Sequence, residues 1–217
     1  MSNRIRHLMF IFWLIPGALF SALGAYAAEV NLTAELPYLD IKYEGKQVRI
    51  QRIQDTQNRL DNSFTKTSRP CPPFCIGPMH AAVGVTTVGE LELFNFLIEK
   101  VRTGTGLLID SRLPEWFQKG TIPGSVNIPW TLLVKGPDNP HTARILRALG
   151  AKEEAGAWDF RPALDLMLFC NGPWCDQSPR AIKNLTLLGY PPQKLYYYRG
   201  GMQLWQILGL TTAVPEQ

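Results

Sequence analysis

The feature that most constrains the fold is an alternation of short apolar segments with helical ones from residue 83 onward. The expected strands are 107–109, 126–129, 164–169 and 194–198, and the expected helices are 88–101, 141–149, 179–188 and 203–208. Strands that are apolar throughout and joined through helices are typical of parallel sheets covered on both faces. The pattern therefore predicts an α/β domain with a mainly parallel sheet over residues 83–217.

Local signals predict where two of these helices begin. Thr87 followed by Glu90 has the spacing of a capping box, which predicts the start of the helix over 88–101. Ser178 stands before Pro179, and a serine cap with proline at the first helical position is a common helix start. We therefore expect Ser178 to cap the helix over 179–188.

The residues before this domain have the pattern of a β-hairpin followed by a loop. Segments 38–43 and 48–53 alternate in polarity and flank a turn, 44–47, that contains Gly45. Residues 61–78 are polar and then rich in proline. We interpret residues 28–82 as an N-terminal hairpin arm with a Cys/Pro-rich loop.

The first 27 residues have the pattern of a secretory signal peptide. Arg4 and Arg6 precede an apolar run over 8–20, and Ala-Tyr-Ala at 25–27 fits the usual cleavage pattern. The run is shorter than the roughly 20 residues of a membrane span and contains Pro16, which favours cleavage over an uncleaved anchor. We expect export, to the periplasm of a Gram-negative bacterium, with no stable membrane anchor after cleavage.

Composition excludes several classes of protein. The 217-residue chain is 46% hydrophobic and 18% charged, which is ordinary for a globular protein and rules out disordered, collagenous and coiled-coil chains. The net charge is only +4 and no basic run is present, so we expect no nucleic-acid partner. The sequence also lacks the glycine motifs of serine hydrolases, P-loop enzymes and dinucleotide-binding folds.

Four cysteines form two close pairs. Cys71 and Cys75 flank two prolines in the loop, and a local disulfide is their expected use outside the cytoplasm. The alternative is a four-thiolate metal site shared with Cys170 and Cys175, although these spacings only border the range of structural zinc sites. We expect no metal and no cofactor.

The main candidate site is the loop between the strand over 164–169 and the helix that follows. Cys170 stands at the end of this strand, where sites form in open α/β sheets, and Cys175 lies five residues later. Backbone N–H groups and the nearby helix start favour a thiolate or a persulfide anion over a neutral thiol. On these features alone, a structural Cys170–Cys175 disulfide carries nearly equal weight.

An ordered set of motifs resembles the rhodanese (sulfurtransferase) family. The matching segments are 107–112 with Glu115, 120–129, 168–170, Ser178, 188–190 and 198–205, so the resemblance covers about 87–210. It implies an open parallel sheet of about five strands flanked by helices. It also implies that Cys170 cycles between thiolate and persulfide, and that Asp110 and Arg112, which match a D-x-R signature, support the site as an ion pair.

The activity implied by this resemblance is sulfur transfer from a small donor such as thiosulfate to Cys170, and then to a thiol acceptor or cyanide. The expected substrate-binding and loop residues are Asn171, Gly172, Pro173, Trp174, Asp176, Gln177, Ser178 and Arg180. The sequence departs from the family in a loop about two residues longer, in a basic residue that comes only at Arg180, and in Thr121 where a histidine is usual.

The second loop cysteine leaves three roles open. The first is that Cys175 resolves a persulfide by forming a disulfide with Cys170, and the second is that Cys175 itself accepts the sulfur. The third possibility is a static disulfide, which would make the chain a non-catalytic binding module or a redox-sensing protein. The sequence identifies no protein partner.

Overall fold

The computed structural model describes residues 29–134 and 139–216. The expected signal peptide, residues 1–27, lies outside these residues. Within the two described ranges, no helix has the length and apolar character that crossing a membrane requires.

The body is built on a five-stranded sheet in which every neighbouring pair of strands is parallel, in the order β3-β9-β8-β4-β5. The strands are β3 (Thr86–Val88), β4 (Gly106–Asp110), β5 (Ser125–Asn127), β8 (Asp165–Phe169) and β9 (Leu195–Tyr198). The helices are α1 (Glu90–Phe96), continued by a π-helix over Leu97–Val101, α2 (Pro114–Phe117), α3 (Thr142–Ala148), α4 (Gln177–Leu187) and α5 (Gly201–Ile207). Short 3₁₀ helices cover Ser63–Thr65, Trp130–Leu133 and Pro192–Lys194. The predicted α/β fold with a five-stranded parallel sheet is confirmed.

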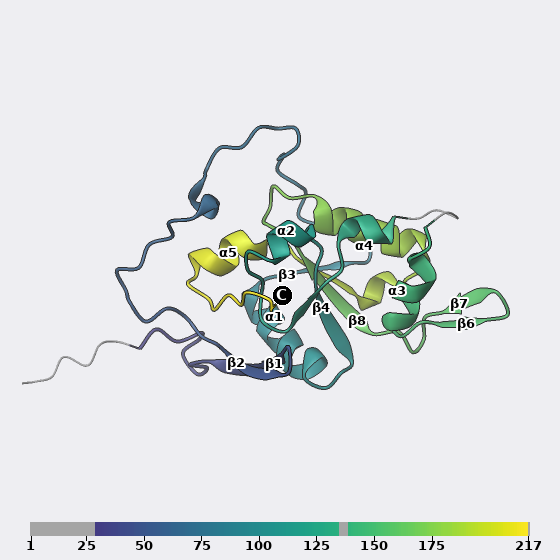
Figure 1. Cartoon of the computed structure of the whole chain (residues 1–217), viewed down its shortest axis with the longest axis horizontal. Coiled ribbons are helices and arrows are strands. Elements are labelled where there is room, and N and C mark those ends of the chain that lie inside the picture. Colours follow the sequence, from purple (N-terminus) through teal and green to yellow (C-terminus); the bar gives the residue numbers. More distant parts are fainter. Residues whose placement is uncertain (1–28, 135–138, 217) are drawn as a thin grey trace, which may run out of the picture.

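Helices cover both faces of this sheet (Figure 1). Along β8, Met167 and Phe169 belong to the core on the side of α1 and α5, whereas Leu166 and Leu168 belong to the core on the side of α3 and α4. Successive strand residues point to opposite faces, so a sheet buried on both faces needs strands without polar alternation. This is the physical reason for the apolar runs in the sequence.

Both predicted helix starts are wrong by a few residues. Thr87 lies inside β3 and pairs with Tyr197, and α1 begins after Gly89, whose N–H donates to the Glu92 carboxylate at 3.0 Å. The helix after the cysteine loop begins at Gln177 with Asp176 as its N-cap, so Ser178 is already helical. Ser178 is buried in the first turn of this helix instead of capping it from outside.

The predicted N-terminal hairpin is confirmed as β1 (Leu39–Tyr43) and β2 (Lys46–Ile50). Its turn is shorter than expected, because Glu44 and Gly45 both adopt positive φ and Tyr43 already pairs with Lys46. Two-residue turns of this kind match the twist of the strands that they join.

The hairpin is part of the core rather than an appendage. Leu39, Ile41 and Ile50 are buried and belong to the same core as Leu97 and Ile122. Apolar burial of this kind is the main favourable term in folding, so the hairpin stabilises the face of the sheet that α1 and α5 also cover.

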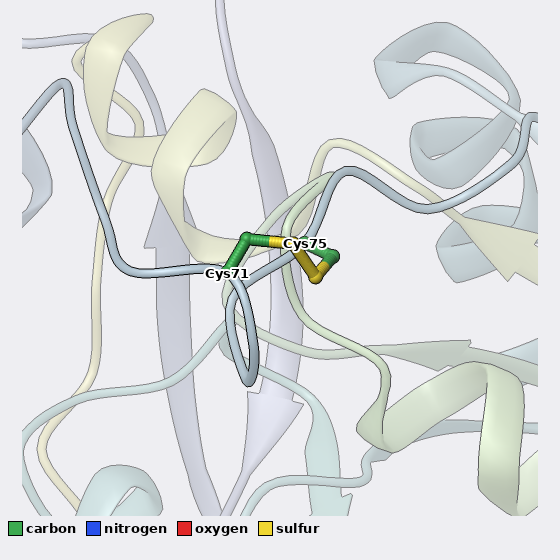
Figure 2. The surroundings of a disulfide bond; sticks show 2 residues. All are labelled: Cys71 and Cys75. Carbon is green, nitrogen blue, oxygen red and sulfur yellow. A yellow bond between two sulfur atoms is a disulfide. The ribbon is translucent and has the colours of Figure 1, made fainter.

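After β2 the chain passes around the side of the body that carries α5 before it returns to β3 (Figure 1). We call residues 62–79 of this connection the strap. The strap contains the predicted disulfide between Cys71 and Cys75, which closes a single small turn (Figure 2).

A second antiparallel hairpin, β6 (Lys152–Glu154) and β7 (Ala157–Asp159), follows α3 and projects from the body (Figure 1). The sequence analysis does not predict it.

Candidate active site

The loop after β8 places two sulfur atoms inside the protein. Cys170 follows the last residue of β8 and its residue surface is 1% exposed, and Cys175 is 8% exposed. The two cysteines are free thiols, not a disulfide. A tight turn, in which the Cys175 N–H donates to the Gly172 carbonyl at 2.9 Å, folds the loop back on itself.

Backbone N–H groups surround both sulfurs. The N–H groups of Gly172 and Ser178 donate to the sulfur of Cys170, and those of Asn171 and Gln177 donate to the sulfur of Cys175. Two of these four donors come from the first turn of α4, where N–H groups have no partner within the helix. This arrangement can stabilise a negative charge on sulfur.

The surroundings separate the acidities of the two thiols. Burial raises the pKa of Cys170, but hydrogen bonds from the Cys175 thiol, from the N–H and hydroxyl of Ser178 and from the Gly172 N–H lower it by more, so the net shift is downward. Burial and the hydrogen bond to Cys170 raise the pKa of Cys175 well above that of an ordinary thiol. Cys170 is therefore the more acidic thiol of the pair, and Cys175 is the less acidic one.

Ser178 has a specific role in this arrangement. Its side chain is buried, its hydroxyl has no other partner among the described residues, and it helps to lower the pKa of Cys170. When Cys170 is protonated, its thiol donates to the carbonyl oxygen of Cys175 at 3.2 Å.

The start of α5 holds the cysteine loop from one side. The N–H groups of Met202 and Gln203 donate to the carbonyls of Cys170 and Asn171, each at 2.9 Å. Gly201 has φ +55°, and a Cβ built on it would lie 2.4 Å from the Cys170 carbonyl oxygen and 2.7 Å from the Gly172 nitrogen. Only glycine permits this close approach of the two backbones.

Asp110 and Arg112 form a fully buried ion pair at the end of β4. Arg112 Nε lies 2.8 Å from Asp110 Oδ1, and the Thr121 hydroxyl donates to the same carboxylate at 2.8 Å. The Arg112 guanidinium also donates to the Asn171 side-chain carbonyl at 3.4 Å. The pair thus connects the end of β4 to the first residue after Cys170.

Two of the expected substrate-binding residues lie on the surface instead. Arg180 Nε is 2.7 Å from a carboxylate oxygen of Asp176, and both side chains are more than half exposed. The Arg180 guanidinium also lies 5.0 Å from the centre of the Trp130 ring. The loop therefore brings Asn171, Gly172, Gln177 and Ser178 to the sulfurs, and turns Asp176 and Arg180 toward solvent.

Pro173 and Trp174 face the strap. The Pro173 carbonyl accepts from the Gly77 N–H at 2.8 Å, and the Trp174 indole donates to the Gln203 side chain at 2.6 Å. The Arg69 guanidinium lies 3.8 Å from the centre of the Trp174 ring, and the Phe74 ring meets Trp174 edge-on with centroids 5.6 Å apart.

Sequence reasoning missed these strap contacts. Arg69 and Phe74 belong to an irregular, proline-rich segment with no periodicity that could predict their neighbours. The cysteines that flank the two prolines were the one available signal that this segment adopts a fixed shape.

The alternative four-thiolate metal site is not formed, because Cys71 and Cys75 are joined to each other. In the part of the chain that the structure describes, no three His, Cys, Asp or Glu side chains lie close enough together to hold a metal ion.

A family model described as Rhodanese-like domain matches residues 95–208, slightly more than half of the chain. The matched region runs from α1 through α5 and includes the whole cysteine loop.

Several solved structures are also similar to the chain. A rhodanese-related protein from Thermoplasma volcanium is 18% identical, with a TM-score of 0.40 and coverage of 60% of this chain and 99% of that one. The human single-domain sulfurtransferase TSTD1 is 25% identical, with a TM-score of 0.38 and coverage of 57% and 96%. A thiosulfate sulfurtransferase from Pseudomonas aeruginosa is 17% identical, with a TM-score of 0.41 and coverage of 61% and 21%. Among curated proteins, none matches the chain.

Proposed function

The chain belongs to the rhodanese-like domain family, and from this premise we propose that it is a sulfurtransferase that carries sulfane sulfur on Cys170. One observation carries the proposal. The Cys170 sulfur is buried at the end of β8 among N–H, hydroxyl and thiol donors that lower its pKa. A thiolate is the nucleophilic form of cysteine, and a persulfide anion at the same place would use the same donors.

In the first step the Cys170 thiolate attacks the outer sulfur of a donor such as thiosulfate. A sulfur–sulfur bond forms to Cys170, the sulfur–sulfur bond of the donor breaks, and sulfite leaves with the bonding electron pair. Cys170 then carries a persulfide anion. The N–H groups of Gly172 and Ser178 support this step because they are already oriented toward the sulfur.

In the second step a thiol acceptor or cyanide attacks the outer persulfide sulfur. The Cys170–sulfur bond breaks, and its electron pair returns to Cys170 as the thiolate. With cyanide the product is thiocyanate, and with a thiol it is the acceptor's persulfide. No external oxidant or reductant is needed in either step.

In this scheme Cys175 donates a hydrogen bond to Cys170. Its raised pKa keeps it protonated at neutral pH, which opposes its attack on the persulfide. If Cys175 did attack, a Cys170–Cys175 disulfide would form and hydrogen sulfide would be released. The order of the two pKa values thus favours a persulfide that lasts long enough to meet an acceptor.

We place this activity in the periplasm, as the basic, apolar and small-residue pattern of residues 1–27 suggests. Intact mass of the exported protein tests this part of the proposal. Cleavage after Ala27 supports it, and an unprocessed N-terminus in the cytoplasmic fraction contradicts it.

Intact mass also tests the chemistry. After mild reduction and exposure to thiosulfate, the protein should gain about 32 Da, the mass of one sulfur atom, and a thiol reductant should remove this gain. Cys170→Ser should abolish both the adduct and the transfer to cyanide, whereas Cys175→Ser should keep the adduct.

Two outcomes would contradict the proposal. If Cys170→Ser keeps full transfer and Cys175→Ser loses it, the nucleophile is Cys175. If no redox state of the wild-type protein gains sulfur, and a Cys170–Cys175 disulfide persists, the chain is a binding module rather than an enzyme.

A further inference from the structure

A cavity of about 800 Å³ lies between the strap and the cysteine loop. The strap lines it with Lys66, Arg69 and Phe74, and the body lines it with Trp174, Arg199 and Gln203. This volume is in the range of sites that hold a small organic molecule. The matched family region begins at residue 95, and eight of the twelve residues that line this cavity lie outside that region.

The charged residues that line the cavity are all positive. Lys66, Arg69 and Arg199 line it, and no Asp or Glu does. Within residues 29–134 and 139–216, none of these three cations forms a salt bridge. Three uncompensated positive charges around one hollow attract an anion.

The two arginines are held in place by neutral groups. Arg199 donates to the carbonyls of Gly77 at 2.9 Å and Pro78 at 3.2 Å. Arg69 donates to the Ser63 carbonyl at 2.9 Å, lies on the Trp174 ring, and has a buried Nε without a hydrogen-bond partner. Both guanidinium groups are therefore oriented in advance and keep their full charge, which suits the recognition of carboxylates.

We propose that this cavity binds the sulfur acceptor, a small thiol that carries two carboxylates. The inference rests on the proposed sulfurtransferase function. The cavity is much larger than an inorganic dianion such as thiosulfate needs, and its aromatic wall of Phe74 and Trp174 suits an organic molecule. The wall also includes Pro173, so the bound molecule contacts the loop that carries Cys170.

The transfer step is balanced without further reactants. The acceptor sulfur bonds to the outer persulfide sulfur, and the thiol proton passes to that transferred sulfur. The bond between Cys170 and the transferred sulfur breaks, and its electron pair returns to Cys170 as the thiolate. Cys170 is buried and does not line the cavity, so part of the loop between them has to move before the thiol reaches its sulfur. The carboxylates remain on the arginines and hold the acceptor beside the loop while this happens.

The test compares two acceptors that differ in charge. Mercaptosuccinate carries two carboxylates and 2-mercaptoethanol carries none, and cyanide reports the basal transfer. In Lys66→Gln/Arg69→Gln, the KM for mercaptosuccinate should rise at least about tenfold, since each lost charged contact weakens binding severalfold. Any change in the KM for 2-mercaptoethanol or in the rate with cyanide should be at least about fivefold smaller than this rise, because neither acceptor carries a carboxylate.

Two further variants serve as controls. Arg59→Gln removes the same charge from an exposed residue of the N-terminal arm outside this cavity, and should leave every KM unchanged. Lys66→Gln alone changes only an exposed side chain and should raise the KM for mercaptosuccinate by a smaller factor, even if the double variant folds poorly.

Calorimetric titration with methylthiosuccinate, which cannot accept sulfur, separates the two proposals. Binding that the double variant loses, together with sulfur transfer to mercaptosuccinate, supports the acceptor site. Binding without any persulfide on Cys170 overturns the proposed function, and the acceptor role with it, but leaves a dicarboxylate site. Transfer to both thiols with no binding, or with binding that the double variant keeps, overturns the acceptor site alone.

Discussion

The two cysteine pairs have nearly the same spacing and opposite states. Cys71 and Cys75 are exposed and joined as a disulfide, whereas Cys170 and Cys175 are buried, free and different in acidity. The intervening backbone accounts for much of the contrast. Two prolines separate the strap cysteines and have no N–H to donate, while the residues around Cys170 and Cys175 supply four such donors. Spacing permits a disulfide in both places, and the hydrogen-bond donors distinguish the pair of free thiols from the cross-linked pair.

The largest effect should come from removing the support of the Cys170 loop. In Gly201→Ala the new Cβ would lie 2.4 Å from the Cys170 carbonyl oxygen, so the loop must shift. The N–H groups of the loop would then no longer be oriented toward the Cys170 sulfur. We expect sulfur transfer to cyanide to fall by about 100-fold or more, because misplacement by about 1 Å can cost that much. The free energy of unfolding should fall by about 2–3 kcal/mol, from the clash and the positive φ together. Steady-state assays and denaturant unfolding measure the two effects.

Gly104→Ala is the matched control for this change. Gly104 also has a positive φ, +73°, but nothing lies within 4 Å of a Cβ built there. It should lose about 1 kcal/mol of stability from backbone strain alone and keep its transfer rate. If Gly201→Ala behaves in the same way as Gly104→Ala, close support of the loop by α5 is not what distinguishes the Cys170 pair.

An intermediate effect should follow from Ser178→Ala, which removes one donor from the Cys170 sulfur. Because the hydroxyl lowers the pKa of Cys170, its loss raises that pKa. The thiolate is the form present above the pKa. The rate of persulfide formation should therefore fall up to about tenfold at pH values below the wild-type pKa, and stay unchanged at pH values above both. The pH dependence of alkylation of Cys170 by iodoacetamide gives the same pKa independently.

Thr186→Ala controls for the loss of a hydroxyl from the same helix. The Thr186 hydroxyl donates to the Ile182 carbonyl at 2.9 Å, away from the loop. Its removal should leave the pH profile in place. An unchanged profile in Ser178→Ala as well would mean that the backbone donors alone set the acidity of Cys170.

The smallest effect should come from opening the other pair. In Cys71→Ser/Cys75→Ser the cross-link lost closes a very short loop, worth about 2 kcal/mol at most in unfolded-chain entropy. Transfer to cyanide should change less than about twofold, because the donors to Cys170 remain. Loss of persulfide formation in this variant would contradict separate roles for the two cysteine pairs, since it would show that the pairs exchange electrons or sulfur.

Much of the fold was predictable because the apolar runs in the sequence indicate where the central strands lie. The strands around 107–109, 164–169 and 194–198 lie within one residue of β4, β8 and β9. These strands are buried on both faces of the sheet and therefore show a run of apolar residues without polar alternation. The expected strand over 126–129 also overlaps β5 (Ser125–Asn127), but β3 was not predictable in this way. β3 has three residues, and its pairing with β9 overrides the capping pattern of Thr87.

The β6–β7 hairpin shows a second limit. Lys152, Glu153 and Glu154 form an exposed strand without any apolar alternation. What fixes this hairpin is its turn, where Ala155 and Gly156 both adopt positive φ. A positive φ at alanine is uncommon, so the sequence does not indicate it.

In the candidate site, too, the residues that are close in sequence were predictable, and the contacts between distant residues were not. Cys170, Cys175, Gly172 and Ser178 lie in one short segment, so the chain itself brings them together. Which of them face the sulfurs depends on where α4 begins. The helix starts two residues earlier than expected, with Asp176 as its N-cap, and this places Ser178 inside and Arg180 on the surface. The strap contacts join residues about 100 positions apart, such as Arg69 and Trp174, and no local pattern encodes them.

Because the first hairpin is buried, the residues that fold together extend beyond the residues that the family model matches. The family-matched residues, 95–208, contain Leu97 and Ile122, which pack in one core with Leu39, Ile41 and Ile50 of the hairpin. Excision of the matched residues alone would leave an apolar patch open to water, and such patches promote aggregation. Any transplant of this site into another protein therefore has to carry the hairpin with the matched residues.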